Sequence, residues 1–569
     1  MGETKPVHFE PAQRGSRRAR AIPKGRPVDP EALAEVRALL GDEPRSRDHM
    51  IEHLHKIQDR YGCLSAAHLV ALARELRLAP TEVYEVATFY HHFDVVKEGA
   101  GGETAGPAAL TVRVCDSIAC ELAGAKALLE KLPGLLGREV RVIPAPCVGR
   151  CEVAPCAVVG QNPIGNATAE AVRKAVADKA VACPPTPYID FEAYRASGGY
   201  KLAADCHAGR RTREELTKIM EDSGLRGLGG AGFPAGRKWR VVSAEPGPRL
   251  MAVNIDEGEP GTFKDRWYLE RDPHRFLEGM LVAAWAVDIA EIYIYLRDEY
   301  AGCRAILEKE LDLLRSKIEF KIPPIHLRRG AGAYICGEES AMIESIEGKR
   351  GMPRLRPPYV AQVGLFGRPT LEHNMETVLW VREIVEKGPA WFTSHGRHGR
   401  KGLRSFSVSG RVKKPGMHLA PAGITIRELI DEYCGGMLDG HAFYAYLPGG
   451  ASGGILPASK DDLPLDFDTL QPHGCFIGSA AIVILSDRDK ATDAARNLMS
   501  FFKHESCGQC TPCRVGTAKA LQLMDERRWN QPLLKELSQA MMDASICGLG
   551  QAAPNPALSV MRYFEHEVS

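Results

Sequence analysis

The spacing of apolar residues divides the chain into two helical ends and a middle that mixes helices with strands. Over residues 31–97 apolar side chains recur every three or four positions, and Pro30 and Pro80 stand where helices commonly begin. The same spacing returns over 491–569. Between these regions, short alternating or continuously apolar runs predict strands. We therefore expect helical domains at both ends of a longer mixed α/β region.

The predicted strands fall into three groups with different surroundings. The first group shares about 80 residues with a helix, which predicts a small α/β domain. After residue 186 the chain is rich in glycine, and strongly apolar strands are predicted at 250–254 and 292–296. The third group surrounds a helix at 425–433, and we interpret it as an antiparallel α+β module. The strands of the first group are predicted at 109–114, 139–143 and 157–159, and those of the third at 405–412, 417–419 and 442–447.

The length and the linkers predict a multidomain α/β and α+β protein. The chain has 569 residues, too many for one hydrophobic core. Stretches rich in glycine or proline at 99–106 and 183–187 mark linkers. The predicted regions are a basic flexible tail (1–30), a helical bundle (31–105), a small α/β domain (106–185), a glycine-rich α/β domain (186–401), an α+β module (402–490) and a C-terminal helical domain (491–569).

Composition and charge exclude several classes of protein. The chain is 44% hydrophobic and 25% charged, which is typical of a soluble globular protein. Its net charge of +1 provides no overall field for nucleic acid or a membrane surface. The most apolar stretch, 280–296, contains Asp288 and Glu291 and is too short to span a bilayer. Without an apolar signal-peptide core, we expect a cytoplasmic protein, whose basic tail is either solvated or an arm that clasps a partner subunit.

Eight of the sixteen cysteines form two tight groups, which suggests metal clusters in a reducing compartment. In the C-terminal group, Cys507, Cys510 and Cys513 follow a C-x2-C-x2-C pattern, and Cys547 stands apart. Three thiolates on a tight loop can reach three corners of a cube, and a remote fourth closes it. Zinc ligands usually come as two separated pairs. This spacing predicts a 4Fe–4S cluster.

The N-terminal group consists of two cysteine pairs, Cys115 with Cys120 and Cys147 with Cys151. Each pair follows a predicted strand, so two loops would converge at one edge of the small α/β domain. Two pairs of thiolates suit a 2Fe–2S cluster, but paired spacing is also typical of zinc, and spacing leaves both open. The other cysteines are interpreted as buried apolar thiols: Cys63, Cys156, Cys183, Cys206, Cys303, Cys336, Cys434 and Cys475.

Three segments of the glycine-rich domain could bind a nucleotide. Residues 224–238 offer free backbone N–H groups and Lys238, which suit a phosphate, although a helix is predicted before them instead of the strand of the usual dinucleotide fingerprint. Residues 254–265 place acidic side chains after a strand, where they could accept hydrogen bonds from sugar hydroxyls. Residues 330–340 combine glycines with two glutamates. Taken singly, each segment could equally be a mobile loop or a solvated turn.

Together these segments resemble the NADH-oxidising flavoprotein module of respiratory complex I and its soluble relatives. Residues 1–185 are similar to the companion 24-kDa-type subunit, a helical bundle followed by a thioredoxin-like 2Fe–2S domain, which favours iron–sulfur over zinc. Residues 402–490 are similar to the ubiquitin-like β-grasp (SLBB-like) module of the same family. The motifs that carry the resemblance are Val-Ala-Thr-Phe-Tyr (86–90), Gly-Leu-Gly-Gly-Ala-Gly-Phe-Pro (227–234), Asn-Ile-Asp-Glu-Gly-Glu-Pro-Gly (254–261), Gly-Ala-Tyr-Ile-Cys-Gly-Glu-Glu (332–339), Ser-Gly-Arg-Val-Lys-Lys-Pro-Gly (409–416) and Glu-Ser-Cys-Gly-Gln-Cys-Thr-Pro-Cys-Arg (505–514).

The resemblance implies a Rossmann-like domain that binds FMN and NAD(H), besides the 4Fe–4S and 2Fe–2S clusters. No catalytic side chain is expected beyond the flavin, and Glu259 and Glu339 would position NADH. Leu228 replaces an arginine common in complex I, and Glu372-His373 replaces a more usual Ile-Asn, which argues against complex I itself. The residues that would hold FMN are Gly227, Gly229, Gly230, Lys238, Asn254, Asp256, Tyr334, Gly337, Glu338, Asn374 and Thr377, and those that would meet the nicotinamide nucleotide are Phe233, Glu259, Glu339, Arg356 and Tyr359.

These cofactors together imply an electron-transfer function. Hydride exchange with NAD(H) moves two electrons, an iron–sulfur cluster accepts one, and a flavin converts between the two. The fusion of both subunit types resembles the diaphorase (beta) subunit of cytosolic NAD-dependent formate dehydrogenases, which implies a large Mo/W-containing, formate-oxidising alpha subunit as partner. The alternatives are the diaphorase subunit of an NAD-reducing hydrogenase, the NADH-input module of complex I, and an electron-transfer scaffold with an inactive nucleotide site.

Overall fold

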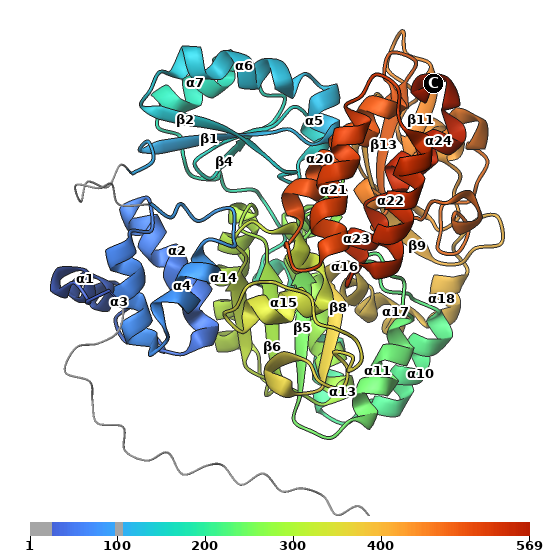
Figure 1. Cartoon of the computed structure of the whole chain (residues 1–569). Coiled ribbons are helices and arrows are strands. Elements are labelled where there is room, and N and C mark those ends of the chain that lie inside the picture. Colours follow the sequence, from blue (N-terminus) through green and yellow to red (C-terminus); the bar gives the residue numbers. More distant parts are fainter. Residues whose placement is uncertain (1–25, 97–105) are drawn as a thin grey trace, which may run out of the picture.

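The computed structural model describes residues 26–96 and 106–569. Most of the basic tail predicted over 1–30, and nearly all of the linker predicted over 99–106, lie outside these residues. The described chain contains helices at both ends and three separate sheets between them (Figure 1), which confirms the predicted multidomain α/β and α+β class. Within the described ranges no helix is long and apolar enough to cross a membrane. The apolar stretch 280–296 is the end of one helix followed by a buried strand.

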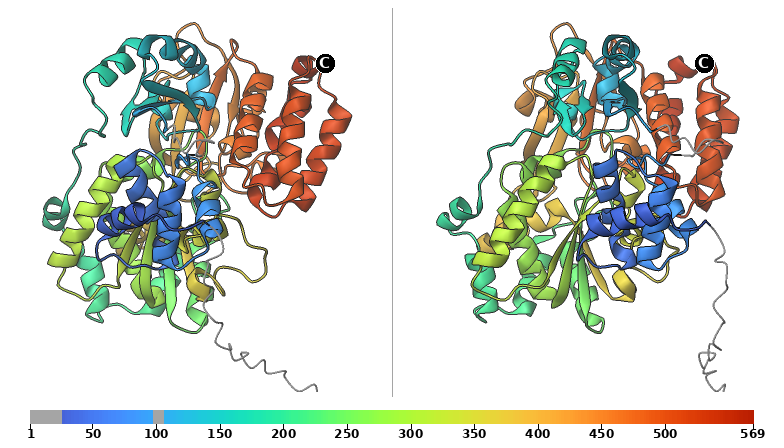
Figure 2. Two further views of the ribbon diagram at one scale, coloured as in Figure 1. Left: turned by 60° about the vertical axis from the view of Figure 1, so that its left-hand side comes forward. Right: turned by 90° about the vertical axis from the view of Figure 1, so that its left-hand side faces the viewer.

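The N-terminal helices fold as a bundle against the flank of a parallel sheet (Figure 2). Local signals set their ends: the Asp29 carboxylate accepts N–H groups of the first turn, Gly62 ends a helix in the left-handed region, and the Ser65 hydroxyl caps the next helix. A hydrogen bond of 2.7 Å joins buried His55 Nε2 to the carbonyl of Gly330 in the sheet domain. The four helices are α1 Pro30–Leu40, α2 Met50–Tyr61, α3 Ala66–Leu76 and α4 Pro80–Ala87.

The small α/β domain has a four-stranded sheet of order β2-β1-β3-β4. Strands β1 and β2 are parallel, so their carboxyl ends meet at one edge of the sheet, while β3 and β4 run antiparallel to their neighbours. The last strand is a short hairpin partner that the sequence reading did not identify. The elements are β1 Leu110–Cys115, β2 Val140–Ala145, β3 Ala157–Val159 and β4 Asn162–Ile164, with helices α5 Ile118–Leu122, α6 Ala125–Leu136 and α7 Ala169–Ala177.

The central domain is built on a fully parallel sheet of order β7-β6-β5-β8. The chain runs outward from β5 through β6 to β7 and then returns to the other side of β5, so the strand order reverses at β5. Open α/β sheets bind ligands at the carboxyl end of such a reversal. The strands are β5 Arg249–Ile255, β6 Ile289–Leu296, β7 Ile325–Arg329 and β8 Thr370–Asn374; the helices are α8 Phe191–Ala196, α9 Lys201–His207, α10 Arg213–Ser223, α11 Ala235–Ala244, α12 Lys264–Leu269, α13 Pro273–Val287, α14 Ala301–Lys317, α15 Glu339–Ile346, α16 Met375–Leu379, α17 Val381–Lys387 and α18 Pro389–Thr393.

The following module is a five-stranded sheet of order β10-β9-β13-β11-β12. The expectation of a purely antiparallel module is wrong for one pair, because β9 and β13 are parallel. The sequence reading did not single out β13, which returns after a long connection and inserts at the centre of the sheet. The small α/β domain packs on this module through α5 and the turn after β2 (Figure 2). The elements are β9 Leu403–Gly410, β10 Gly416–Pro421, α19 Ile426–Glu428, β11 Phe443–Leu447, β12 Leu456–Pro457 and β13 Ala481–Ser486.

The C-terminal helices lie beside this module (Figure 1). The carboxylate of Glu567, near the end of the chain, accepts the N–H groups of Ala491 and Thr492 and so caps the first of these helices. Helix α25 therefore contacts the start of α20 at the beginning of the same domain. The helices are α20 Ala491–Glu505, α21 Thr511–Met524, α22 Gln531–Ala544, α23 Gly548–Ala552, α24 Asn555–Tyr563 and α25 Glu565–Val568.

Candidate functional site

The four C-terminal cysteines line one small cavity. Cys507 and Cys510 lie on the loop that leaves α20, Cys513 is in the first turn of α21, and Cys547 directly precedes α23. Burial raises the pKa of Cys513 to about 11 and that of Cys547 to about 12. Buried thiols of this kind become thiolates when a cationic metal centre joins them. The three-plus-one arrangement expected from the spacing is therefore present, and it fits an iron–sulfur cluster.

The four N-terminal cysteines also come together, at the edge where β1 and β2 end. Cys115 is the last residue of β1, Cys120 is in α5, and Cys147 and Cys151 lie on the loop after β2. All four are at most 3% exposed, and the Sγ atoms of Cys147 and Cys151 are 3.3 Å apart. Two loops thus converge as the strand order predicts, and they supply four thiols for one metal centre.

A cavity of about 740 Å³ opens at the carboxyl edge of β5. Asn254 and Asn374 are register partners at the ends of β5 and β8, so both side chains lie at the point where the strand order reverses. The Asn254 amide donates to the carbonyl of Gly337 at 2.9 Å, and the Asn374 amide donates to Asp265 Oδ2 at 2.8 Å. The predicted site residues that line this cavity are Gly229, Gly230, Asn254, Asp256, Glu259, Tyr334, Gly337, Glu338 and Asn374.

The glycine-rich loop that forms one wall lies between α10 and α11. A helix precedes it, as expected, so it is not the strand-to-helix turn of the usual dinucleotide fingerprint. A β-carbon at position 229 would lie 3.0 Å from Asn374 Cβ, closer than such atoms normally approach. Gly229 therefore lets the loop backbone reach the end of β8. A flat ligand can then lie against bare backbone N–H groups.

The cavity contains buried charges that are unusually well paired. The Lys264 ammonium is 2.8 Å from Asp265 Oδ1 and 3.2 Å from both Asn374 Oδ1 and Glu376 Oε2. Burial alone would lower the pKa of Lys264, but the surrounding carboxylates raise it above its ordinary value. This lysine is therefore charged, and it offsets much of the negative charge on the cavity floor.

Asp256 and Glu259 line the same cavity but differ in their hydrogen bonding. Asp256 Oδ2 is buried and has no hydrogen-bond partner among the described residues, and burial raises the pKa of Asp256 well above its usual range. A buried carboxyl oxygen without a partner fits a ligand that brings a hydrogen-bonding group such as a hydroxyl. Glu259 is instead satisfied, because its carboxylate accepts the Ser452 N–H at 2.8 Å and the Tyr334 hydroxyl. Glu259 thereby joins the parallel-sheet domain to the five-stranded module.

The remaining predicted residues lie outside the cavity lining, and several of them form ion pairs. The Lys238 ammonium donates to the carbonyl and the carboxylate of Glu372 at 3.0 Å. Glu339 is 2.9 Å from Arg356, whose guanidinium also pairs with Glu338. Of the predicted residues, those that do not line the cavity are Gly227, Phe233, Lys238, Glu339, Arg356, Tyr359 and Thr377; Phe233 and Tyr359 are 42% and 56% exposed.

The two departures from the complex I pattern have structural explanations. Leu228 is buried, and its N–H donates to Thr377 Oγ1 at 2.9 Å. His373 is buried and accepts a hydrogen bond of 2.9 Å from Trp239 Nε1. Neither side chain lines the cavity. Leu228 and His373 therefore change the packing behind the site, whereas Glu372 pairs with Lys238.

Several cavity residues were missed by the sequence reading. Lys264 and Asp265 lie in the acidic segment 254–265, so their proximity to the site could have been inferred from the sequence. The others come from the five-stranded module and the C-terminal helices, far along the chain, and no local motif marks them. They include Phe467, Phe476, Ser479, Gln551 and Asn555, whereas Arg226, which was also missed, lies in the glycine-rich segment 224–238.

Two cysteine clusters beside a cavity at a strand-order reversal define an iron–sulfur protein with a nucleotide site. Four family models match it: a thioredoxin-like [2Fe-2S] ferredoxin over 36–180, the Nuo51 FMN-binding domain over 220–383, an SLBB domain over 405–456, and the NADH-ubiquinone oxidoreductase-F iron-sulfur binding region over 493–569. These matches identify FMN, NAD(H), a 4Fe–4S cluster and a 2Fe–2S cluster as the cofactors, and they decide between iron–sulfur and zinc.

Comparisons with individual proteins and with a solved structure indicate the same family. The chain is 41% identical over 402 residues to the mitochondrial NADH-ubiquinone oxidoreductase 51 kDa subunit of Neurospora crassa, covering 65% of this chain and 80% of that protein. It is 40% identical over 376 residues to NADH dehydrogenase [ubiquinone] flavoprotein 1 of Dictyostelium discoideum, covering 63% and 78%. An air-oxidized NAD+-reducing [NiFe]-hydrogenase structure superposes with a TM-score of 0.80 and 30% identity, covering 93% of this chain and 94% of that one. The chain belongs to the family of NADH dehydrogenase 51-kDa flavoproteins, here fused to a thioredoxin-like 2Fe–2S domain.

We expect Cys510→Ala to abolish the 4Fe–4S cluster and electron transfer to a partner, but to spare part of the NADH-dependent reduction of ferricyanide. Dyes can take electrons directly from the flavin, and loss of the cluster should loosen α20–α23 because thiolate ligation stabilises the fold. Electron paramagnetic resonance, iron content and the apparent melting temperature measure these effects. Cys434→Ala, which removes a buried thiol of the five-stranded module, is the control. Partner-linked turnover in a variant without the 4Fe–4S signal would contradict this electron path.

We expect Lys238→Ala to lower FMN content more than it raises the Michaelis constant for NADH. A lysine directed at a phosphate contributes roughly 1.5–3 kcal/mol, or about ten- to a hundred-fold in binding. Because Lys238 also pairs with Glu372, the double variant Lys238→Met/Glu372→Gln separates the two roles. If that double variant recovers full flavin content, Lys238 serves Glu372 and not the phosphate.

Proposed function

We propose that the chain is the diaphorase subunit of a cytosolic NAD-dependent formate dehydrogenase, with a large Mo/W-containing alpha subunit as its partner. FMN supplies the conversion between hydride exchange with NAD(H) and one-electron exchange with the clusters. The chain itself must hold these groups close together and keep water from the reacting ring. Formate would be oxidised in the partner, and the electrons would leave this chain as NADH.

The observation that carries the diaphorase function is that the two cavities share a wall. Ile335 and Leu549 line both the cavity at β5 and the cavity of the four C-terminal cysteines. A flavin in the first cavity and a cluster in the second would be separated by about one layer of side chains. Electron transfer becomes rapid at such short separations. An inactive scaffold would not require this arrangement of the two cavities.

The roles that we propose for the site residues follow from where each residue lies. We assign FMN to this cavity and to Lys238 beside it, with Asn254, Asn374 and the glycine loop against the flavin and Asp256 hydrogen-bonded to a hydroxyl. The exposed rim with Phe233, Arg356 and Tyr359 would receive the nicotinamide nucleotide. Glu259, held by Tyr334 and Ser452, would fix the position of the bound nucleotide from the module side.

A second candidate is the diaphorase subunit of an NAD-reducing hydrogenase. The observation that favours it is the superposition with such an enzyme over 93% of this chain, whereas the matches to the Neurospora and Dictyostelium flavoproteins cover 65% and 63% of it. Both candidates share the same chemistry in this chain and differ in the subunit that feeds it. The predicted formate partner rests on the order and length of the two fused subunit types, while the departures at 228 and 372–373 argue only against complex I itself.

Purification of the intact complex distinguishes the two. A molybdopterin cofactor with molybdenum or tungsten, together with formate-driven reduction of NAD+, would support the formate assignment. Nickel and hydrogen-driven reduction of NAD+ would reject it in favour of the hydrogenase. If the complex reduces no dye with NADH at all, the diaphorase function itself is wrong.

We expect Glu339→Gln to raise kcat/KM for NADPH by roughly ten-fold or more, with a smaller loss for NADH. The extra phosphate of NADPH carries nearly two negative charges, and at ~5 Å and an effective dielectric of ~20 a carboxylate repels each charge by about 3 kcal/mol. Solvent reduces this, yet ~2 kcal/mol is still roughly thirty-fold. Glu308→Gln, on the exposed face of α14, is the matched control. Equal losses with both nucleotides would show that Glu339 only supports the turn.

A further inference from the structure

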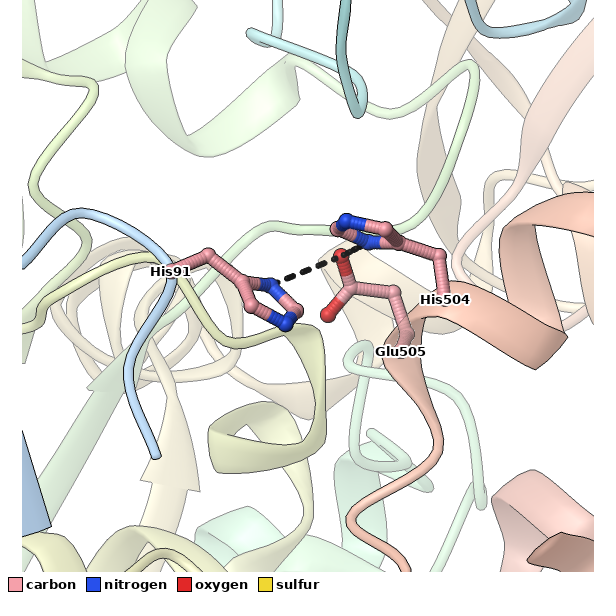
Figure 3. A group of neighbouring side chains, drawn as sticks. All are labelled: His91, His504 and Glu505. Carbon is pink, nitrogen blue, oxygen red and sulfur yellow. Dashed lines mark hydrogen bonds and ion pairs between the residues drawn. The ribbon is translucent and has the colours of Figure 1, made fainter. Parts of the chain in front are cut away.

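A group of three side chains outside the flavin cavity brings together two distant parts of the chain. His91 follows α4 in the N-terminal bundle, whereas His504 and Glu505 are the last two residues of α20 (Figure 3). His504 Nδ1 lies 3.0 Å from Glu505 Oε1, and His91 Nδ1 lies 3.8 Å from the same oxygen. One potential ligand atom from each residue lies within 4.8 Å of the other two. No sequence motif indicated this juxtaposition.

We propose that His91, His504 and Glu505 form a binding site for a first-row divalent metal ion, Zn²⁺ above all, that ties the N-terminal bundle to the 4Fe–4S domain. A tetrahedral zinc with bonds of about 2.0–2.2 Å places its ligand atoms about 3.3–3.6 Å apart. The two separations to Glu505 Oε1 bracket this range. Two imidazoles and one carboxylate are ligands that zinc accepts, with the fourth position left for water.

The carboxylate of this group is already oriented. Glu505 is only 4% exposed, and its Oε2 accepts the backbone N–H of Tyr334 at 2.9 Å, which leaves Oε1 toward the two histidines. A hydrogen bond that fixes the second oxygen of a ligating carboxylate is typical of metal sites. The His91 backbone is likewise held, because its N–H donates to the carbonyl of Gly332 at 3.2 Å. Little rearrangement is therefore needed to bind an ion.

The surroundings provide access and a place for water. The side chains of His91 and His504 are 40% and 51% exposed, so an ion can enter from solvent. All three residues also line a cavity of about 220 Å³, which continues between the small α/β domain and the parallel-sheet domain. Its other charged groups balance one another, because Arg113 and Arg297 line it together with Glu299 and Asp256, so the charge of an ion would be met by Glu505 itself.

Bound zinc would directly link the N-terminal bundle and the C-terminal helices, where His91 Nδ1 and Glu505 Oε1 are 3.8 Å apart. Glu505 precedes Cys507 by two residues, and its other oxygen holds Tyr334, whose hydroxyl contacts Glu259 in the flavin cavity. The ion would thus fasten the bundle to the loop that carries the 4Fe–4S ligands. This site does not depend on whether the partner oxidises formate or hydrogen.

The test uses the holoprotein with FMN and both clusters in place. After treatment with EDTA and desalting, iron and FMN are measured to show that both remain, and Zn²⁺ is titrated against a chromophoric chelator. We expect one zinc site in the wild type, weakened about ten-fold or more in His91→Ala and in His504→Ala. The matched control is His398→Ala, because His398 pairs with Glu428 at 3.1 Å but no second histidine joins that pair.

A second measurement protects the test against variants that fold poorly. Because a ligand that binds only the folded state stabilises it, Zn²⁺ should raise the apparent melting temperature of the wild type and of His398→Ala. His91→Gln, which keeps the size of the side chain but offers no imidazole, should lose this shift while retaining FMN and iron. Equal zinc affinity in the wild type and both histidine-to-alanine variants, or no zinc binding by the wild type, would overturn the proposal.

Discussion

The constraint on which this structure depends is the reversal of strand order at β5. Because β8 returns to the opposite side of β5 from β6, the ends of two neighbouring strands open into a crevice, and Asn254 and Asn374 lie opposite each other at its floor. The glycine loop, the cysteine cavity of the C-terminal helices and the five-stranded module are all arranged around this one edge. Ile335 and Leu549 line both the cavity at this edge and the cavity of the C-terminal cysteines, so the two cavities are neighbours.

Holding several domains around one crevice requires buried polar contacts between them. Glu259 reaches from the parallel-sheet domain to Ser452 of the module, and Arg266 reaches from the same domain to Glu152 beside the 2Fe–2S loop. Charges buried in this way are costly unless they are paired, and here Arg266 pairs with both Glu152 and Glu270. Such contacts fix the orientation of the domains more strictly than apolar packing alone. The separation between the cofactors therefore depends on a small number of ion pairs and hydrogen bonds.

The chemistry of the site follows from an uneven distribution of charge. The interior of the cavity carries Lys264 among several carboxylates, whereas the rim places Arg356 and the exposed rings of Phe233 and Tyr359 near solvent. The interior suits a ligand that stays bound, because its polar groups are paired within the protein or, like Asp256 Oδ2, lack only a partner from the ligand. The rim suits a nucleotide that enters and leaves, because its side chains are partly hydrated and can exchange partners. One crevice can thus hold a resident flavin and still admit NAD(H).

Features that depend on neighbouring residues could be predicted from the amino-acid sequence alone. The helix ends at Asp29 and Ser65, the helix before the glycine loop, and the three cysteines at 507, 510 and 513 all follow from local spacing and capping. The resemblance to the flavoprotein module of complex I indicated the family and its cofactors. Features that depend on distant segments could be seen only in the folded protein. They are the parallel pairing of β9 with β13, the module residues that line the cavity, and the proximity of His91 to His504. Local spacing carries no information on such contacts, because they form only when separate elements bury their apolar faces together.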